Sequence, residues 1–130
     1  MSDSKLDIPL PSALRPRWIR LLAVALVAIT ILYLSVTPPG QQQAQSPDKL
    51  QHLIGYSVLT LASVYAVFDL DIDPRITIGG TILATVLYGV AMEIIQSTLE
   101  YRAFETGDMY ANASGALLVA LLLVVYSRVS

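Results

Sequence analysis

The sequence of 130 residues contains no cysteine, a single histidine and few charged residues. The absence of cysteine excludes disulfides, thiolate nucleophiles, iron–sulfur clusters and zinc sites built on cysteine. Charged residues make up 14% of the chain. Soluble domains carry about 25%, so this chain has too few charges to cover a surface that faces water. The net charge of -2, with eight scattered Lys and Arg residues, argues against a nucleic-acid partner.

Apolar residues make up 55% of the chain, which excludes a disordered protein. The length suits one domain, and four segments in it are long and apolar enough to cross a membrane. They are residues 18–37, 47–68, 74–99 and 108–126. We therefore expect an all-α fold, an integral membrane four-helix bundle. Residues 1–16 are expected to form a cytoplasmic tail, and residues 17–130 the bundle domain.

The boundaries of these segments carry helix start and stop signals. The first apolar run ends at residues 37–40, Thr-Pro-Pro-Gly, with no small-x-small cleavage site, which favours a retained helix over a cleavable signal peptide. Residues 46–47, Ser-Pro, and residues 73–74, Asp-Pro, are each typical of an N-cap followed by the first helical position. Gly79, Gly80, Gly89 and Gly115 lie inside the segments, where we expect them to allow close helix packing.

Basic residues predict how the bundle lies in the membrane, because they are enriched in cytoplasmic flanks. Four spans place the N-terminus, the second connection and the C-terminus on one side. That side carries six basic residues: Lys5, Arg15, Arg17, Arg20, Arg75 and Arg128. The other side carries Lys49 and Arg102. We expect a multi-pass plasma-membrane protein with both termini in the cytoplasm.

Polar residues interrupt three of the spans near their expected outer ends. Within each span they are three or four residues apart, which places them on one helix face. The set consists of Asp48, His52 and Tyr56, then Glu93 and Gln96, then Arg102 in the connection, then Asp108 and Asn112. We expect these side chains to meet in one outward-facing site just below the membrane surface.

The residue types suggest roles in acid–base chemistry and ligand binding. Glu93, His52 and Asp48 are the candidate catalytic residues, since an oriented histidine or an intramembrane carboxylate can transfer protons. Arg102 is the candidate phosphate or carboxylate ligand, because its guanidinium forms bidentate hydrogen bonds. The remaining ligand-binding candidates are Gln96, Asp108, Asn112 and Tyr56.

Each candidate also has a structural interpretation. In the structural interpretation, hydrogen bonds from Glu93, His52 and Asn112 do no more than hold helices together. Asp108 then caps the fourth helix. Arg102 can pair with Asp108, Glu105 or Glu100. One histidine with carboxylates is a weak zinc pattern, so we expect no metal and no other cofactor. Likewise, Asp69, Asp71 and Asp73 indicate a solvated turn with a helix cap rather than a cation site.

The same polar residues resemble those of a known family. Asp48-Lys49-x-x-His52 followed by Tyr56 is similar to the D-K-x-x-H…Y start of the VanZ-like family. A second stretch resembles its E-x-x-Q…R…D…N-x-x-G pattern: Glu93, Gln96, Arg102, Asp108, Asn112 and Gly115. The resemblance extends over residues 30–125, with Leu53 standing where an aromatic is expected. It implies a small polytopic protein of the cell envelope, in a family named for a protein linked to teicoplanin resistance.

Two functions remain open at this point. In the first, the outward-facing site binds or acts on a lipid headgroup or a lipid-linked envelope precursor, so membrane lipids are the expected partners. In the second, the chain is a non-enzymatic accessory or assembly protein whose polar residues are structural. A transporter built on Glu93 is less favoured, because no ionisable residue lies in the inner half of any span.

Overall fold

The computed structural model describes residues 9–37, 48–100 and 106–129. In these ranges the chain forms a short 3-10 turn, η1 (Ser12–Leu14), and the helices α1 (Arg17–Val36), α2 (Asp48–Val67), α3 (Pro74–Ser97) and α4 (Thr106–Val129). No strand occurs in the described ranges, and the expected all-α fold of four helices is confirmed. The helix ends lie close to the expected ones, with the largest difference at α4, which continues to Val129.

Local sequence explains where the helices begin and end. The Asp73 side chain accepts a 2.8 Å hydrogen bond from the backbone N–H of Arg75, and Pro74 occupies the first helical position, as predicted. At the other end of the chain, α4 begins at Thr106, so Asp108 lies inside the first turn rather than at the expected cap position. The expected cap at residues 46–47 falls outside the described residues.

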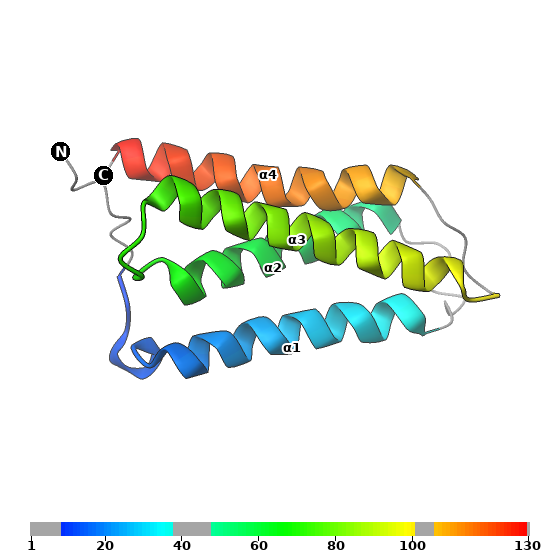
Figure 1. Ribbon diagram of the computed structural model, residues 1–130, viewed down its shortest axis with the longest axis horizontal. Coiled ribbons are helices and arrows are strands. Elements are labelled where there is room, and N and C mark those ends of the chain that lie inside the picture. The colour runs from blue at the N-terminus through cyan, green and yellow to red at the C-terminus, as the bar shows by residue number, and fades with distance from the viewer. Residues whose placement is uncertain (1–8, 38–47, 101–105, 130) are drawn as a thin grey trace.

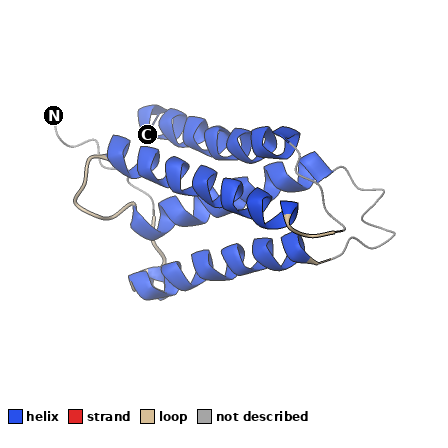
Figure 2. Ribbon diagram, turned by 45° about the vertical axis from the view of Figure 1, so that its right-hand side comes forward, coloured by secondary structure: helices blue, strands red, loops and turns tan. Residues whose placement is uncertain are grey.

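The four helices lie side by side along the long axis of the molecule, with α2 in contact with each of the other three (Figure 1). The contact between α2 and α4 is the most extensive, and α1 packs mainly on α2. A second view shows the same arrangement, with helices joined by loops and no strand in the described residues (Figure 2). Because the number of antiparallel helices is even, the first turn of α1 and the last turn of α4 lie at the same end.

The bundle exposes most of its large apolar side chains. Its buried apolar core is small and includes Val64, Val119 and Leu123, with Phe68 and Ile78 packed against them. By contrast, Trp18, Leu22 and many other large apolar residues of the four helices point outward. All four helices are long and apolar enough to cross a membrane by length and composition. The distribution is compatible with a membrane protein, whose outer surface is in contact with lipid.

Two of the glycines inside the helices sit where another helix comes close. A Cβ atom on Gly115 would lie 2.6 Å from the Leu53 carbonyl oxygen, and one on Gly89 would lie 2.9 Å from Asn112 Nδ2. These glycines therefore allow α4 to approach α2 and α3, as expected. Gly79 and Gly80 differ from the expectation, because no described atom lies within 4 Å of a Cβ at either position.

Candidate functional site

A buried group of polar side chains lies between α2, α3 and α4, near the bundle end at which α2 begins. We call it the polar cluster, and it consists of the buried Tyr56, Glu93 and Asn112 and the half-buried His52. Glu93 lies four residues before the end of α3 at Ser97, which is about 6 Å along the helix axis. The sequence therefore placed these four candidate residues correctly on three helices at one end of the bundle.

His52 and Asn112 join α2 to α4 directly. His52 Nδ1 lies 2.8 Å from Asn112 Oδ1, and since an amide oxygen only accepts, the histidine carries the donated proton in this orientation. The His52 ring is parallel to that of Tyr56, with centroids 6.3 Å apart and an interplanar angle of 6°. The predicted polar stripe on one face of α2 is thus present at these two residues.

Asn112 has hydrogen-bonding capacity left after this contact. The residue is 2% exposed, and its Nδ2 atom has no hydrogen-bond partner among the described residues. The Tyr56 hydroxyl also has no hydrogen-bond partner among the described residues, and the Tyr56 side chain is likewise 2% exposed. Buried polar groups are nearly always hydrogen-bonded, so these two atoms are exceptions that make the cluster a candidate site.

Glu93 is the largest fully buried side chain among the described residues, with 0% exposure. It lies within electrostatic range of the Tyr56 hydroxyl. The Tyr56 ring is in turn 6.4 Å from the Tyr88 ring, and the Tyr88 hydroxyl donates to the Ala28 carbonyl of α1. A carboxylate in such surroundings is expensive to leave charged without polar neighbours, which is why intramembrane carboxylates are functional candidates.

Gln96 shares the buried side of α3 with Glu93 but contacts a different helix. Its Nε2 atom donates a 3.1 Å hydrogen bond to the Ser35 carbonyl, one of the last four carbonyls of α1, which have no partner within their own helix. The sequence predicts that Gln96 binds a ligand, which stays a prediction. In the structure one of its donors holds the end of α1 against α3.

The structure does not describe the side chains of three other predicted site residues. Arg102 lies outside the described residues. Asp48 and Asp108 belong to the first turns of α2 and α4, and their side chains lie outside the described part of the chain. Among the side chains that the structure does describe, no group of three His, Cys, Asp or Glu residues is placed to hold a metal ion.

A groove of about 190 Å³ runs between α3 and α4 beside the polar cluster. Its walls are almost wholly apolar, and Asn112 belongs both to the groove and to the cluster. The lining consists of Val86, Gly89 and Val90 on α3 and Met109, Tyr110, Asn112 and Ala113 on α4.

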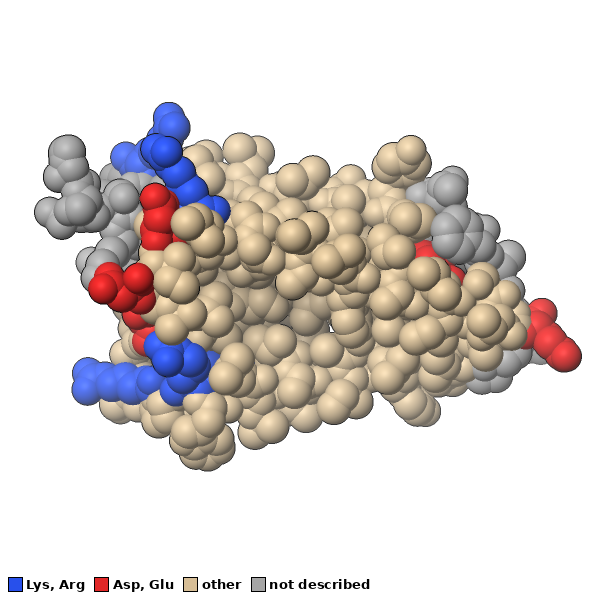
Figure 3. Space-filling model, viewed as in Figure 1, with Lys and Arg blue, Asp and Glu red and all other residues tan. Residues whose placement is uncertain are grey.

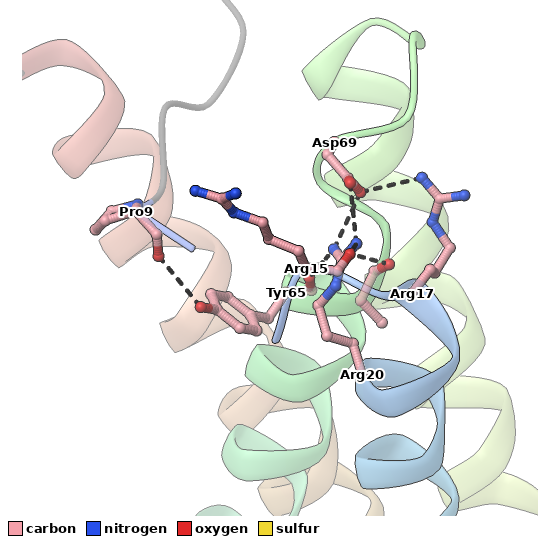
Figure 4. A network of polar contacts seen from close by, with 7 residues as sticks. Pro9, Arg15, Arg17, Arg20, Tyr65 and Asp69 are labelled. Atoms are coloured by element: carbon pink, nitrogen blue, oxygen red, sulfur yellow. Dashed lines mark hydrogen bonds and ion pairs between the residues drawn. The ribbon is translucent and has the colours of Figure 1, made fainter. Parts of the chain in front are cut away.

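A second polar site, which the sequence analysis did not identify, lies at the opposite end of the bundle (Figure 4). We call it the Arg20 site, and it consists of Arg17, Arg20 and Asp69. The two terminal nitrogens of Arg20 donate to the two Asp69 oxygens at 3.0 and 2.9 Å, and Arg17 Nη2 lies 3.2 Å from Asp69 Oδ1. The sequence contains one signal for this site: Arg17 and Arg20 carry the opposite charge to Asp69, and all three lie on segments expected at the same membrane surface.

Arg20 is 2% exposed, although it was expected to be one of several basic residues flanking the first helix. Its Nη1 atom also donates to the carbonyls of Tyr65 and Ala66, at 3.0 and 3.4 Å. These carbonyls belong to the last turn of α2, where backbone acceptors lack helical partners and a positive charge is favourable. Arg20 therefore connects the start of α1 to the end of α2.

The carboxyl group of Asp69 predicts a pH dependence of stability. The hydrogen bond from Arg20, and then that from Arg17, lower its pKa from 3.8 to about 2. The unfolded chain then binds the proton more tightly than the folded one, so this stabilisation is complete above pH 4 and is lost as the pH falls towards 2. The melting temperature of purified protein in detergent should decrease over this interval. The decrease should be smaller in Asp69→Asn; equal decreases in both proteins would contradict the assignment.

Comparisons with known proteins add one relative. The chain is 37% identical over 81 residues to a protein of Schizosaccharomyces pombe described as uncharacterized. The match covers 62% of this chain and 49% of the relative, so the chain spans about half the length of the protein it matches. No protein-family model matches the chain. No solved structure matches it either.

Proposed function

We propose that the chain is a VanZ-like integral membrane protein whose polar cluster binds the phosphate-bearing headgroup of a membrane lipid or of a lipid-linked envelope precursor. The observation that carries the proposal is the convergence of His52, Tyr56, Glu93 and Asn112 from three helices, with unsatisfied buried atoms on Tyr56 and Asn112. The resemblance to the VanZ-like family supports the cell-envelope part of the proposal and carries its link to teicoplanin resistance.

The distribution of charge supports insertion across a membrane. On the face seen in Figure 3, Lys and Arg side chains gather at one end, and a broad band without charges separates them from the other end. The described basic side chains at the first end include Arg15, Arg17, Arg75 and Arg128. The positive-inside rule then favours a cytoplasmic position for this end, with both termini inside and the polar cluster in the outer half of a plasma membrane.

In this arrangement the residues have complementary tasks. Arg102, which the sequence places in the connection between α3 and α4, would supply the positive charge for a phosphate group. The Asn112 amide and the Tyr56 hydroxyl would donate hydrogen bonds to ligand oxygens. Glu93 and His52 are the groups able to accept or release a proton, should the bound lipid be chemically changed.

A purely structural role is the second candidate, and two contacts favour it. His52 ties α2 to α4, and Gln96 ties α3 to the end of α1. In that case the protein would be an accessory or assembly factor, and changes in the polar cluster would reduce stability rather than lipid binding. The headgroup proposal predicts that variants of the polar cluster lose lipid binding and keep their melting temperature. The structural role predicts that they keep lipid binding and melt at lower temperatures.

The test measures which lipids purified protein retains, using Glu93→Gln, His52→Ala and Arg102→Gln variants. We expect enrichment of one phosphate-bearing lipid class by the unmodified chain and a loss of about tenfold in each variant, which corresponds to 1.4 kcal/mol of binding free energy. Lipid mass spectrometry gives the enrichment, and thermal unfolding in detergent gives the stability.

Exposed neighbours provide matched controls. Gln51→Ala changes the residue next to His52, and Glu100→Gln removes a carboxylate at the same end of the bundle; both side chains are exposed. These variants should keep the enrichment. If the Glu93, His52 and Arg102 variants keep it too while melting at lower temperatures, the headgroup proposal is wrong and the structural role stands.

A further inference from the structure

The groove between α3 and α4 adjoins the polar cluster and shares Asn112 with it, but its other lining residues do not belong to the cluster. Its volume of about 190 Å³ is similar to that of apolar cavities, about 150 Å³, that hold a benzene-sized molecule. It is partly open, and the helices that form it, α3 and α4, expose large apolar side chains, including Leu87 at 58% and Leu117 at 57% exposure. In a membrane it would therefore open towards lipid rather than water.

Gly89 lies in the wall of the groove, and its missing side chain leaves room for Asn112 and Tyr56 to pack closely against α3. A Cβ atom there would lie 2.9 Å from Asn112 Nδ2 and 3.2 Å from a carbon of the Tyr56 ring. The amide nitrogen of Asn112 thus packs against Gly89 at the wall of the groove. This nitrogen belongs to a side chain that is 2% exposed, and it has no partner among the described residues. An occupant has to bring an acceptor oxygen to a mostly apolar space.

The position of Asn112 along α4 narrows the choice of molecule that can occupy the groove. Asn112 lies six residues after the start of α4 at Thr106, about 9 Å along the helix axis. A polar group of a lipid at that level lies between its headgroup and its hydrocarbon tail, where ester-linked glycerolipids carry carbonyl oxygens. Those carbonyls accept hydrogen bonds, whereas the methylene groups beyond them fit the apolar walls.

We infer that the groove binds the first methylene groups of one acyl chain of an ester-linked glycerolipid, with the ester carbonyl accepting a hydrogen bond from Asn112 Nδ2. Tyr110 forms part of the rim and is 74% exposed, so its ring can turn aside as the carbonyl enters without loss of buried contacts. The inference rests on the membrane insertion in the proposed function. It names the class of lipid and the part of it that the protein holds.

The experiment uses the full chain reconstituted in vesicles that contain a glycerolipid with a photoactivatable group on one acyl chain. Crosslinks are mapped by mass spectrometry. We expect them to concentrate on Val86, Val90 and Ala113, and to fall at least severalfold in Ala113→Phe, which fills the groove. The matched control is Ala91→Phe, because Ala91 is exposed on α3 and does not line the groove. Crosslinks spread evenly over the bundle, or unchanged by Ala113→Phe, would overturn the inference.

A second arm tests the contact with Asn112 without altering the protein. An otherwise identical ether-linked lipid lacks the carbonyl acceptor and should label the groove roughly three- to tenfold less, as expected for the loss of one hydrogen bond. Equal labelling by both lipids would overturn the Asn112 assignment. The headgroup enrichment described above is measured separately, so loss of groove labelling with intact enrichment rejects this inference and leaves the proposed function standing.

Discussion

Replacing Arg20 with methionine is expected to lower the free energy of unfolding by about 3 kcal/mol, the lower end of the loss for a broken buried ion pair, because Arg20 is 2% exposed but Asp69 is 34% exposed. Methionine retains an unbranched apolar stem but removes every donor of the guanidinium. Asp69 then loses both contacts from Arg20, and the Tyr65 and Ala66 carbonyls lose a donor at the end of α2. Reversible unfolding in mixed detergent micelles measures the change.

Arg17 provides the matched control, because it contacts the same carboxylate from the same helix. Its side chain is 41% exposed and makes one contact of 3.2 Å with Asp69. Exposed ion pairs contribute about 0–1 kcal/mol, so Arg17→Met should have a small effect. If both variants lose a similar amount of unfolding free energy, the burial of Arg20 and its contacts with the α2 carbonyls contribute nothing extra. The role of Arg20 in connecting α1 to α2 would then be wrong.

Replacing Gly115 with alanine is expected to destabilise the bundle by about 2–3 kcal/mol through overpacking. The added Cβ atom would lie 2.6 Å from the Leu53 carbonyl oxygen and 3.1 Å from the Ser57 backbone nitrogen. Because both neighbours are backbone atoms, α4 has to move away from α2 to relieve the contact. That movement also affects the hydrogen bond from Ser57 Oγ to the Gly115 carbonyl, which is 3.3 Å long.

Gly79→Ala is the control for this substitution. Gly79 also lies inside a helix, but no described atom lies within 4 Å of a Cβ at that position. Alanine should therefore leave stability unchanged or raise it by up to about 1 kcal/mol, through its higher helix propensity. The same unfolding assay compares the two variants. If Gly79→Ala lowers the free energy of unfolding as much as Gly115→Ala does, close helix packing at Gly115 is not the cause of the loss.

Much of the polar cluster could be predicted because its spacing is local. His52 and Tyr56 are four residues apart and share a helix face whatever surrounds the helix, and the same holds for Glu93 and Gln96. The position of His52, Glu93 and Asn112 near one end of the bundle followed from their distance to the ends of apolar segments. Their choice of partners could not be predicted this way. Glu93 lies near Tyr56, His52 contacts Asn112, and Gln96 contacts the α1 carbonyl of Ser35.

The Arg20 site shows why such partners were missed. Arg20 and Asp69 are 49 positions apart, and each has a simple local explanation, as a basic flank and as a polar turn. Only the packing of α1 beside the end of α2 buries the arginine and directs it towards the carboxylate. Gly79 and Gly115 illustrate the same limit, since identical residues in similar segments meet open space in one case and a backbone carbonyl in the other.

The sequence alone determined the four helices, their approximate ends and the faces on which the polar residues lie. These properties depend on apolar run length, capping residues and helical periodicity, which act over a few neighbouring positions. The tertiary structure decided which helices touch, which glycines they need and which buried polar groups meet. Those outcomes depend on the rotation and closeness of helices that are far apart in the chain, and hence on the packing of the whole bundle.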